Sequence, residues 1–211
     1  MNLPTKITFS RIALVVTMLL FLLVLGFIPN LPVIYIGNEQ YGVTLYYLIT
    51  FCVFVIAAST DYLDGHLARK WNQVTDLGKF LDPVADKLLV DSLLIFLVIP
   101  HFNMNTLTIP TYCVIIMIIR DLVVDALRFI AAGKGKVLAA NIFGKIKTVL
   151  QMIAIPLVLL NGWPFSYFDM NFGYGRIALI FVYLATLASL LSGIIYVASN
   201  ISVLKEDKKD Q

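Results

Sequence analysis

The stretch IALVVTMLLFLLVLGFI, from Ile12 to Ile28, contains no charged residue. A bilayer core takes about 20 consecutive, mostly apolar residues in one helix. Residues 12–28 are therefore predicted to form a membrane-spanning helix. Lys6 and Arg11 precede the stretch, as in a signal peptide. However, no obvious A-x-A cleavage site is present and further apolar stretches follow, so we expect the helix to be retained.

The composition of the whole chain agrees with a lipid environment. Of its 211 residues, 60% are hydrophobic and 14% are charged, and the mean hydropathy is +0.88. Soluble domains carry about 25% charged residues. The length favours a single domain, predicted over residues 1–204, with a charged cytoplasmic tail at 205–211. Both cysteines lie in apolar stretches, which is typical of packing residues.

The fold is predicted to be all-α: a polytopic six-transmembrane-helix bundle with both termini cytoplasmic. Beyond residues 12–28, spans are predicted at about 42–60, 82–99, 109–132, 146–160 and 177–203. With six spans, every Lys and Arg except Arg176 falls on one side. Cytoplasmic loops carry the excess of positive charge. We therefore expect an integral plasma-membrane protein whose ionisable chemistry faces the cytoplasm.

Four acids gather between the second and third predicted spans, in DYLDGHLAR (61–69) and GKFLDPVADK (78–87). They are Asp61, Asp64, Asp82 and Asp86, spaced three and four apart, so each pair shares a helix face. Like charges at the end of an apolar span are costly. Bound cations would remove the repulsion, and oxygen-only ligands favour Mg²⁺ or Mn²⁺. Four carboxylates suffice for two ions, and one carboxylate could act as a general base.

A purely structural interpretation of these residues stays open for each part alone. A single D-x-x-D is usually a solvated helix end, and Asp82-Pro83 is a standard helix start, with Asp as the cap. The joint array is harder to explain structurally. It also contains Gly65, Ala68 and Gly78, whose small side chains would let a nucleotide approach the backbone, and Arg69, which could pair with a pyrophosphate.

The array D-x2-D-G-x2-A-R-x8-G-x3-D-x3-D resembles the signature of the CDP-alcohol phosphatidyltransferases at every position. The resemblance implies that Asp61, Asp64 and Asp82 bind metal and that Asp86 completes the metal site and acts as general base. It also implies a donor, CDP-diacylglycerol, a leaving group, CMP, and a homodimer among membrane lipids, with no nucleic acid. The residues implied to line the CDP pocket are Gly65, Ala68, Arg69 and Gly78.

The acceptor alcohol is inferred from basic residues further along the chain. A cationic pocket would suit an acceptor with its own phosphate, such as glycerol 3-phosphate or inositol phosphate, rather than serine. The candidate phosphate-binding residues are Arg120, Arg128, Lys145 and Lys147. Two alternatives remain: Asp121, Asp125 and Arg128 could neutralise one another, and the lysines could follow the positive-inside rule.

Two looser likenesses favour glycerol 3-phosphate. The opening NLPTKITFSR (2–11) and the stretch GKIKTVLQ (144–151) are similar to those of phosphatidylglycerophosphate synthases. Asp121 departs from that pattern, because Glu is expected there in many relatives, and its role stays open. Thr8 and Arg11 share a face and could touch the donor's phosphates, or they could belong to an interfacial stretch with Thr caps.

Two other classes of protein could also carry acids among membrane spans. A cation transporter would place them near the middle of the bilayer and would show an inverted repeat. Here the acids lie at one end of the spans and no repeat is evident. A non-catalytic scaffold would not need such crowding of acids. Both alternatives are therefore disfavoured.

Overall fold

The computed structural model describes residues 3–28, 34–36, 42–70, 76–99, 107–135, 138, 141–165 and 176–201. Within these ranges, the side chains of residues 3–4, 61–70, 76–77, 79–80 and 176 are not described. The described residues form six helices and one two-stranded hairpin, which agrees with the all-α prediction. The predicted tail at 205–211 lies outside the described residues. The chain divides into two compact units.

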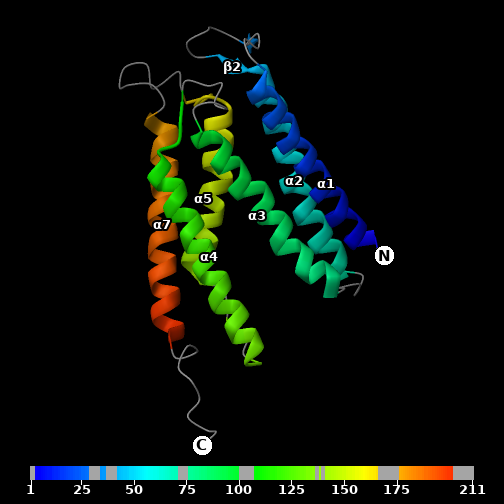
Figure 1. Cartoon of the computed structure of the whole chain (residues 1–211), viewed down its shortest axis with the longest axis vertical. Helices are drawn as coiled ribbons and strands as arrows, with labels where there is room; N and C mark the ends of the chain where they lie inside the picture. Colours follow the sequence, from blue (N-terminus) through cyan, green and yellow to red (C-terminus); the bar gives the residue numbers. More distant parts are fainter. Residues whose placement is uncertain are drawn as a thin grey trace, which may run out of the picture. The chain divides into compact units, whose positions relative to one another are not determined.

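The first unit comprises residues 1–108 and 155–177. Its helices are α1 (Leu3–Phe27), α2 (Leu45–Lys70) and α3 (Asp76–Val98), and α1 packs against both of the others. Strands β1 (Tyr35–Ile36) and β2 (Val43–Thr44) pair antiparallel at the end of α1 and α2 far from the N-terminus (Figure 1). The end of α2 and the beginning of α3 therefore lie at the same end of the unit as the beginning of α1.

The buried face of α1 is polar at its beginning and apolar afterwards. Its buried residues recur every three or four positions, as on one face of a helix: Thr5, Thr8, Arg11, Val15, Met18, Leu22 and Leu25. Thr5, Thr8 and Arg11 are each no more than 3% exposed. Buried polar groups need hydrogen-bond or ionic partners. The beginning of α1 therefore faces a polar interior rather than lipid.

Asn161 joins three segments of the first unit. It follows α5, has a positive φ of 54° and is fully buried. Its Oδ1 accepts a hydrogen bond from the backbone N–H of Leu107 at 3.2 Å. Its Nδ2 donates to the carbonyl oxygen of Gly42 at 3.0 Å. Asparagine tolerates this left-handed conformation better than most residues, and its amide satisfies two buried backbone groups at once.

The second unit comprises residues 109–154 and 178–211. Its helices are α4 (Thr111–Gly133), the first part of α5 (Ile142–Leu159) and most of α7 (Arg176–Asn200). Val124 and Leu127 of α4 pack with Tyr196 of α7 in a small buried cluster. The hydroxyls of Tyr112 and Tyr183 lie 3.3 Å apart, nearer the beginnings of the same two helices. Helices α4 and α7 therefore run side by side.

A helix lies at each of the six predicted spans, but three begin or end elsewhere. Helix α1 begins at Leu3, so Thr5 and Thr8 lie within it, and the interpretation of these threonines as caps is wrong. Helix α2 continues to Lys70 and carries the first acid pair. Helix α3 begins at Asp76, so Pro83 lies inside it and Asp82 is not its cap. Pro83 cannot donate the usual intrahelical hydrogen bond, but its fixed φ is compatible with a helix.

Three helical segments among the described residues are long and apolar enough to cross a membrane: Thr5–Phe27, Ile142–Leu159 and Ile177–Asn200. Residues Leu45–Thr60 of α2 form a shorter apolar segment. Helices α3 and α4 have the length of a span but contain several charged residues. These features identify an integral membrane protein of the all-α class. The number of spans and the side on which the termini lie stay predictions.

Candidate active site

The four predicted metal-binding acids lie on two helices that follow one another in the chain. Asp61 and Asp64 belong to the last part of α2, together with Gly65, Ala68 and Arg69. These positions are helical, and their side chains are outside the described part of the structure. Gly78, Asp82 and Asp86 follow at four-residue intervals in the first half of α3, so they share a face. All eight positions lie in the first unit.

Thr8 and Asp82 are brought together by the packing of α1 on α3. The Thr8 hydroxyl donates to Asp82 Oδ1 at 3.2 Å, across 74 residues of sequence. Thr8 is only 2% exposed, and Asp82 is half-buried. The sequence predicted that Thr8 contacts the phosphates of CDP-diacylglycerol and that Asp82 binds a metal ion. The structure places these two residues in direct contact, with Thr5 and Arg11 buried on the same face of α1.

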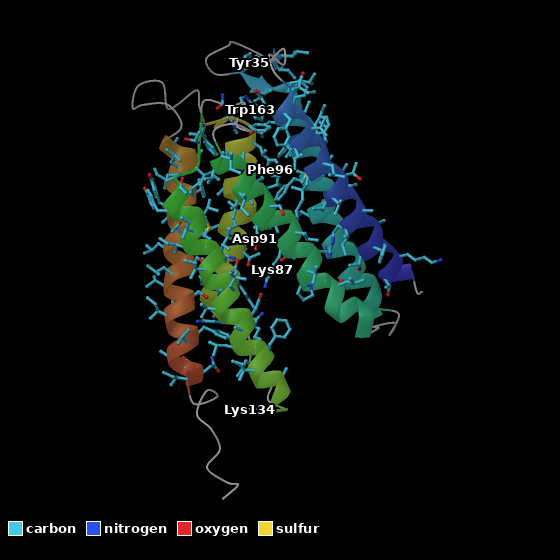
Figure 2. The ribbon with its side chains drawn as sticks, viewed as in Figure 1. Tyr35, Lys87, Asp91, Phe96, Lys134 and Trp163 are labelled. Carbon is cyan, nitrogen blue, oxygen red and sulfur yellow. The ribbon has the colours of Figure 1, made fainter. Side chains whose placement is uncertain are left out.

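Asp86 is half-buried and lies one turn beyond Asp82, next to the fully buried Ala85. Figure 2 shows Lys87 and Asp91 further along α3, one helical turn apart. Both are half-buried. Sequence reasoning did not select Asp91, although a carboxylate within an apolar helix is a signal that could have found it. The charged part of α3 thus extends beyond the signature.

The four aspartates of the signature suit a hard divalent cation as ligands. Every proposed ligand is a carboxylate oxygen, and Mg²⁺ and Mn²⁺ prefer oxygen ligands. A hydroxyl that donates to one carboxylate oxygen leaves the other oxygen free to bind a cation, which is how partners of ligands orient them. Among side chains that the structure describes, no three His, Cys, Asp or Glu residues form a metal-binding group. Asp61 and Asp64 fall outside that search.

A second group of charges lies in the second unit. Asp121 of α4 is 8% exposed and accepts from two cations. Lys147 Nζ of α5 lies 2.5 Å from Asp121 Oδ2, and Arg120 Nη1 lies 2.9 Å from Asp121 Oδ1. Arg120 Nη2 also donates to Ser192 Oγ of α7. We call Arg120, Asp121 and Lys147 the charged trio. Both cations of the trio were predicted to bind the acceptor's phosphate.

The other two predicted acceptor residues lie apart from the charged trio. Arg128, two turns beyond Arg120, donates from Nε to the Tyr196 hydroxyl at 3.2 Å, and its Cζ lies 5.6 Å from that ring centroid. Lys145 is exposed on α5, whereas Lys147 is 6% exposed. The structure therefore separates two lysines that the sequence could not distinguish. It also shows that both oxygens of Asp121 are occupied by Arg120 and Lys147 rather than by Arg128.

Comparison with known proteins agrees with the signature. The family described as CDP-alcohol phosphatidyltransferase matches residues 1–191. The chain is 41% identical to the CDP-diacylglycerol–glycerol-3-phosphate 3-phosphatidyltransferase of Bacillus subtilis (strain 168), over 97% of each chain. Proteins of the same name from Mycoplasma pneumoniae and Wigglesworthia glossinidia brevipalpis are 37% and 34% identical, over 92% and 93% of this chain and 86% and 93% of theirs. Matches of this identity and length show that the chain belongs to the CDP-alcohol phosphatidyltransferase family.

Proposed function

We propose that this protein transfers a phosphatidyl group from CDP-diacylglycerol to sn-glycerol 3-phosphate, giving phosphatidylglycerophosphate and CMP. The observation that carries the proposal is the match over 97% of both chains with a Bacillus subtilis protein named for that reaction. The complete acid signature in α2 and α3 supports it, because an enzyme of this type needs its carboxylates. The relatives from Mycoplasma and Wigglesworthia carry the same name.

We assign the divalent cations, Mg²⁺ or Mn²⁺ and two in number, to Asp61, Asp64, Asp82 and Asp86. Bound there, they would neutralise the donor's pyrophosphate and the charge that builds on the departing CMP. Thr8 supports this assignment, because its hydroxyl bond to Asp82 would fix the direction in which that carboxylate points. The donor's CDP group would lie against Gly65, Ala68 and Gly78, with Arg69 and Arg11 on its phosphates; Thr8 would lie beside them, because its one hydroxyl hydrogen is donated to Asp82.

The reaction is a direct displacement at phosphorus. Asp86 takes the proton from the C1 hydroxyl of glycerol 3-phosphate, and that oxygen bonds to the phosphorus attached to diacylglycerol. The bond from this phosphorus to the oxygen of CMP breaks, and CMP leaves with the electron pair. Arg120, Arg128, Lys145 and Lys147 are assigned to the acceptor's own phosphate. Burial in the charged trio favours Lys147 over the exposed Lys145 as the main contributor.

The location that we propose follows from the same chemistry, and the homodimer follows from the family resemblance. Glycerol 3-phosphate and CMP are cytosolic, whereas both lipids stay in the bilayer. We therefore place the site on the cytoplasmic face of the plasma membrane, in a multi-pass protein that acts as a homodimer among membrane lipids. The distribution of lysine and arginine along the sequence supports this orientation.

The purified full-length protein should release CMP when it is given CDP-diacylglycerol, labelled glycerol 3-phosphate and Mg²⁺ or Mn²⁺. Chelation with EDTA should stop the release, and added metal should restore it. In parallel reactions, serine and inositol phosphate replace glycerol 3-phosphate. Faster turnover with either would move the protein to another acceptor subtype. Failure to release CMP with every acceptor would contradict the transferase proposal.

Replacing Thr8 with valine is expected to weaken metal activation. Valine keeps the shape of the side chain but removes the hydroxyl that donates to Asp82. The metal concentration for half-maximal CMP release should rise about 10-fold, as is typical when a partner of a metal ligand is lost. Thr8→Ser should retain most of the wild-type metal response.

Thr17→Val is the matched control for Thr8→Val. Thr17 lies on the same helix, and its hydroxyl donates to the backbone oxygen of Ala13, at 2.8 Å, on an exposed face. Its replacement should leave the metal response unchanged. An equal change in both variants would mean that α1 tolerates no valine at such positions, and the role assigned to the Thr8 hydroxyl would be wrong.

A further inference from the structure

The charged trio carries an excess of one positive charge in a buried place. Asp121 and Lys147 are 8% and 6% exposed, and the side chain of Arg120 is 13% exposed. Buried charges are tolerated when they are paired and hydrogen-bonded, because the attraction then offsets the loss of hydration. Asp121 supplies one negative charge to two cations. The trio therefore has a net charge of +1, and a further anion would be attracted to it.

The side chain of Arg120 is held in place by its neighbours. A Cβ atom added to Gly193 of α7 would lie 2.8 Å from Arg120 Cγ, and one added to Gly144 of α5 would lie 3.1 Å from Arg120 Nη2. Both distances are shorter than ordinary van der Waals contact. The two glycines thus let α5 and α7 approach the arginine closely, and Ser192 accepts its hydrogen bond. Arg120 therefore has little freedom to change its rotamer.

One hydrogen-bond donor of Arg120 is not used by the neighbours that the structure describes. Its Nε is buried and has no hydrogen-bond partner within the part of the chain that the structure describes. An unsatisfied buried donor destabilises a protein, and an arginine can bind two oxygens of one phosphate in a fork. Lys147, bound to the other oxygen of the same carboxylate, is fixed beside it. Asp121 is the group that both cations share.

We propose that Asp121 is a positioning residue for the acceptor: it holds Arg120 and Lys147 together as a preformed binding site for the phosphate of glycerol 3-phosphate. This inference rests on the proposed function. Asp121 does not touch the acceptor, and it acts through the two cations. One oxygen holds Arg120 and the other holds Lys147, so neither cation has to be reoriented when the acceptor binds. Preorganised groups bind a ligand without the cost of ordering them.

The positioning role and a merely structural role differ in what a substitution changes. If Asp121 only neutralises buried charge, its loss should lower the amount of folded protein and affect both substrates alike. If it positions the cations, its loss should act on the acceptor alone. Asp121→Asn is therefore expected to raise the KM for glycerol 3-phosphate about 10- to 100-fold, as for other residues that orient a ligand's partners. The KM for CDP-diacylglycerol should change less than about twofold.

Asp125→Asn is the matched control for Asp121→Asn. Asp125 lies one turn further along α4 and is half-buried, and its substitution removes the same charge. Its KM for glycerol 3-phosphate should stay within about twofold of the wild type. An equal rise in both variants would show a general effect of charge on α4 and would overturn the specific role of Asp121. Asp121→Glu, which keeps the charge but adds a methylene, should give an intermediate KM.

A double-mutant cycle tests whether Asp121 acts through Lys147. Lys147→Met should raise the KM for glycerol 3-phosphate, and adding Asp121→Asn to it should raise that KM by clearly less than Asp121→Asn does alone, because only the effect through Arg120 remains. Residues that act through one another are not additive. Multiplied effects in the double variant would overturn the proposal. The double variant leaves one buried cation without its carboxylate instead of two, and Arg120 keeps its hydrogen bond to Ser192, so it should be recovered in larger amounts than Asp121→Asn alone.

The outcomes separate this inference from the proposed function. Equilibrium binding of labelled glycerol 3-phosphate, measured without CDP-diacylglycerol, provides a readout besides turnover. If the wild type neither binds nor uses glycerol 3-phosphate, the proposed function fails. If the wild type uses it and Asp121→Asn binds it equally well, only the inference fails. If Asp121→Asn is not recovered, Asp121→Glu decides: a raised KM for the acceptor alone supports the proposal, and unchanged KM values overturn it.

Discussion

Replacing Asp82 with asparagine is expected to abolish phosphatidyl transfer while the protein stays folded. The amide keeps the size of the side chain and can still accept from Thr8, but it loses the charge that would hold a divalent cation. Stabilisation of transition-state charge by a metal contributes several kcal/mol. Turnover should therefore fall by on the order of 10³-fold or more. The test is the rate of CMP release from CDP-diacylglycerol by the variant and the wild type, measured over a range of Mg²⁺ and Mn²⁺ concentrations.

Asp91→Asn is the control for Asp82→Asn. Asp91 lies on the same helix, is half-buried, and stands outside the signature (Figure 2). It should retain most of the wild-type turnover. Thermal unfolding in detergent should show that both variants are folded. Substantial turnover by Asp82→Asn, with metal added, would contradict the metal-binding role of Asp82.

Replacing Asp86 with asparagine is expected to have the second-largest effect, because Asp86 is assigned two tasks. It completes the metal site and takes the proton from the acceptor's hydroxyl. Loss of a general base typically lowers kcat by about 10²- to 10⁴-fold. The asparagine variant should still bind the cytidine nucleotide, since Asp61, Asp64 and Asp82 remain. Turnover and equilibrium binding of CDP, measured on the same preparation, distinguish loss of the base from loss of the whole site.

Asp86→Glu provides the comparison for the asparagine variant. It keeps a base that is one methylene longer, in a half-buried place next to Ala85. Its turnover should lie between those of the wild type and the asparagine variant. If Asp86→Asn turned over at nearly the wild-type rate, proton transfer would have to be assigned to another group. If it failed to bind CDP at all, Asp86 would serve the metal site alone.

The local pattern of the sequence predicted the helices and the membrane class well. Long apolar stretches indicate helices in lipid because unpaired backbone groups are costly there. The ends of the helices were less predictable. Polar residues such as Thr5 and Thr8 resembled an interfacial stretch, and their burial depends on the packing of α1 against α2 and α3, which no local pattern contains. Asp82-Pro83 matched a helix start, yet α3 begins at Asp76.

The partners of the charged residues were the least predictable part of the site. The spacing of Asp121, Asp125 and Arg128 left open that they would neutralise one another along α4. The carboxylate instead binds its sequence neighbour Arg120 and, across 26 residues, Lys147. Helical spacing gives neighbours on the same helix only. Contacts such as those of Arg120 with Ser192, Gly144 and Gly193 depend on which helices pack together.

The hydrogen bonds of Asn161 bear on the order in which the chain can assemble. Its partners belong to the chain near residues 42 and 107, and the first unit is completed only by residues 155–177. Residues 109–154, which belong to the second unit, are synthesised in between. The ribosome must therefore deliver α4 and most of α5 before the earlier helices gain their last partner. A nascent chain that stops near residue 108 would hold α1 to α3 without this closing connection.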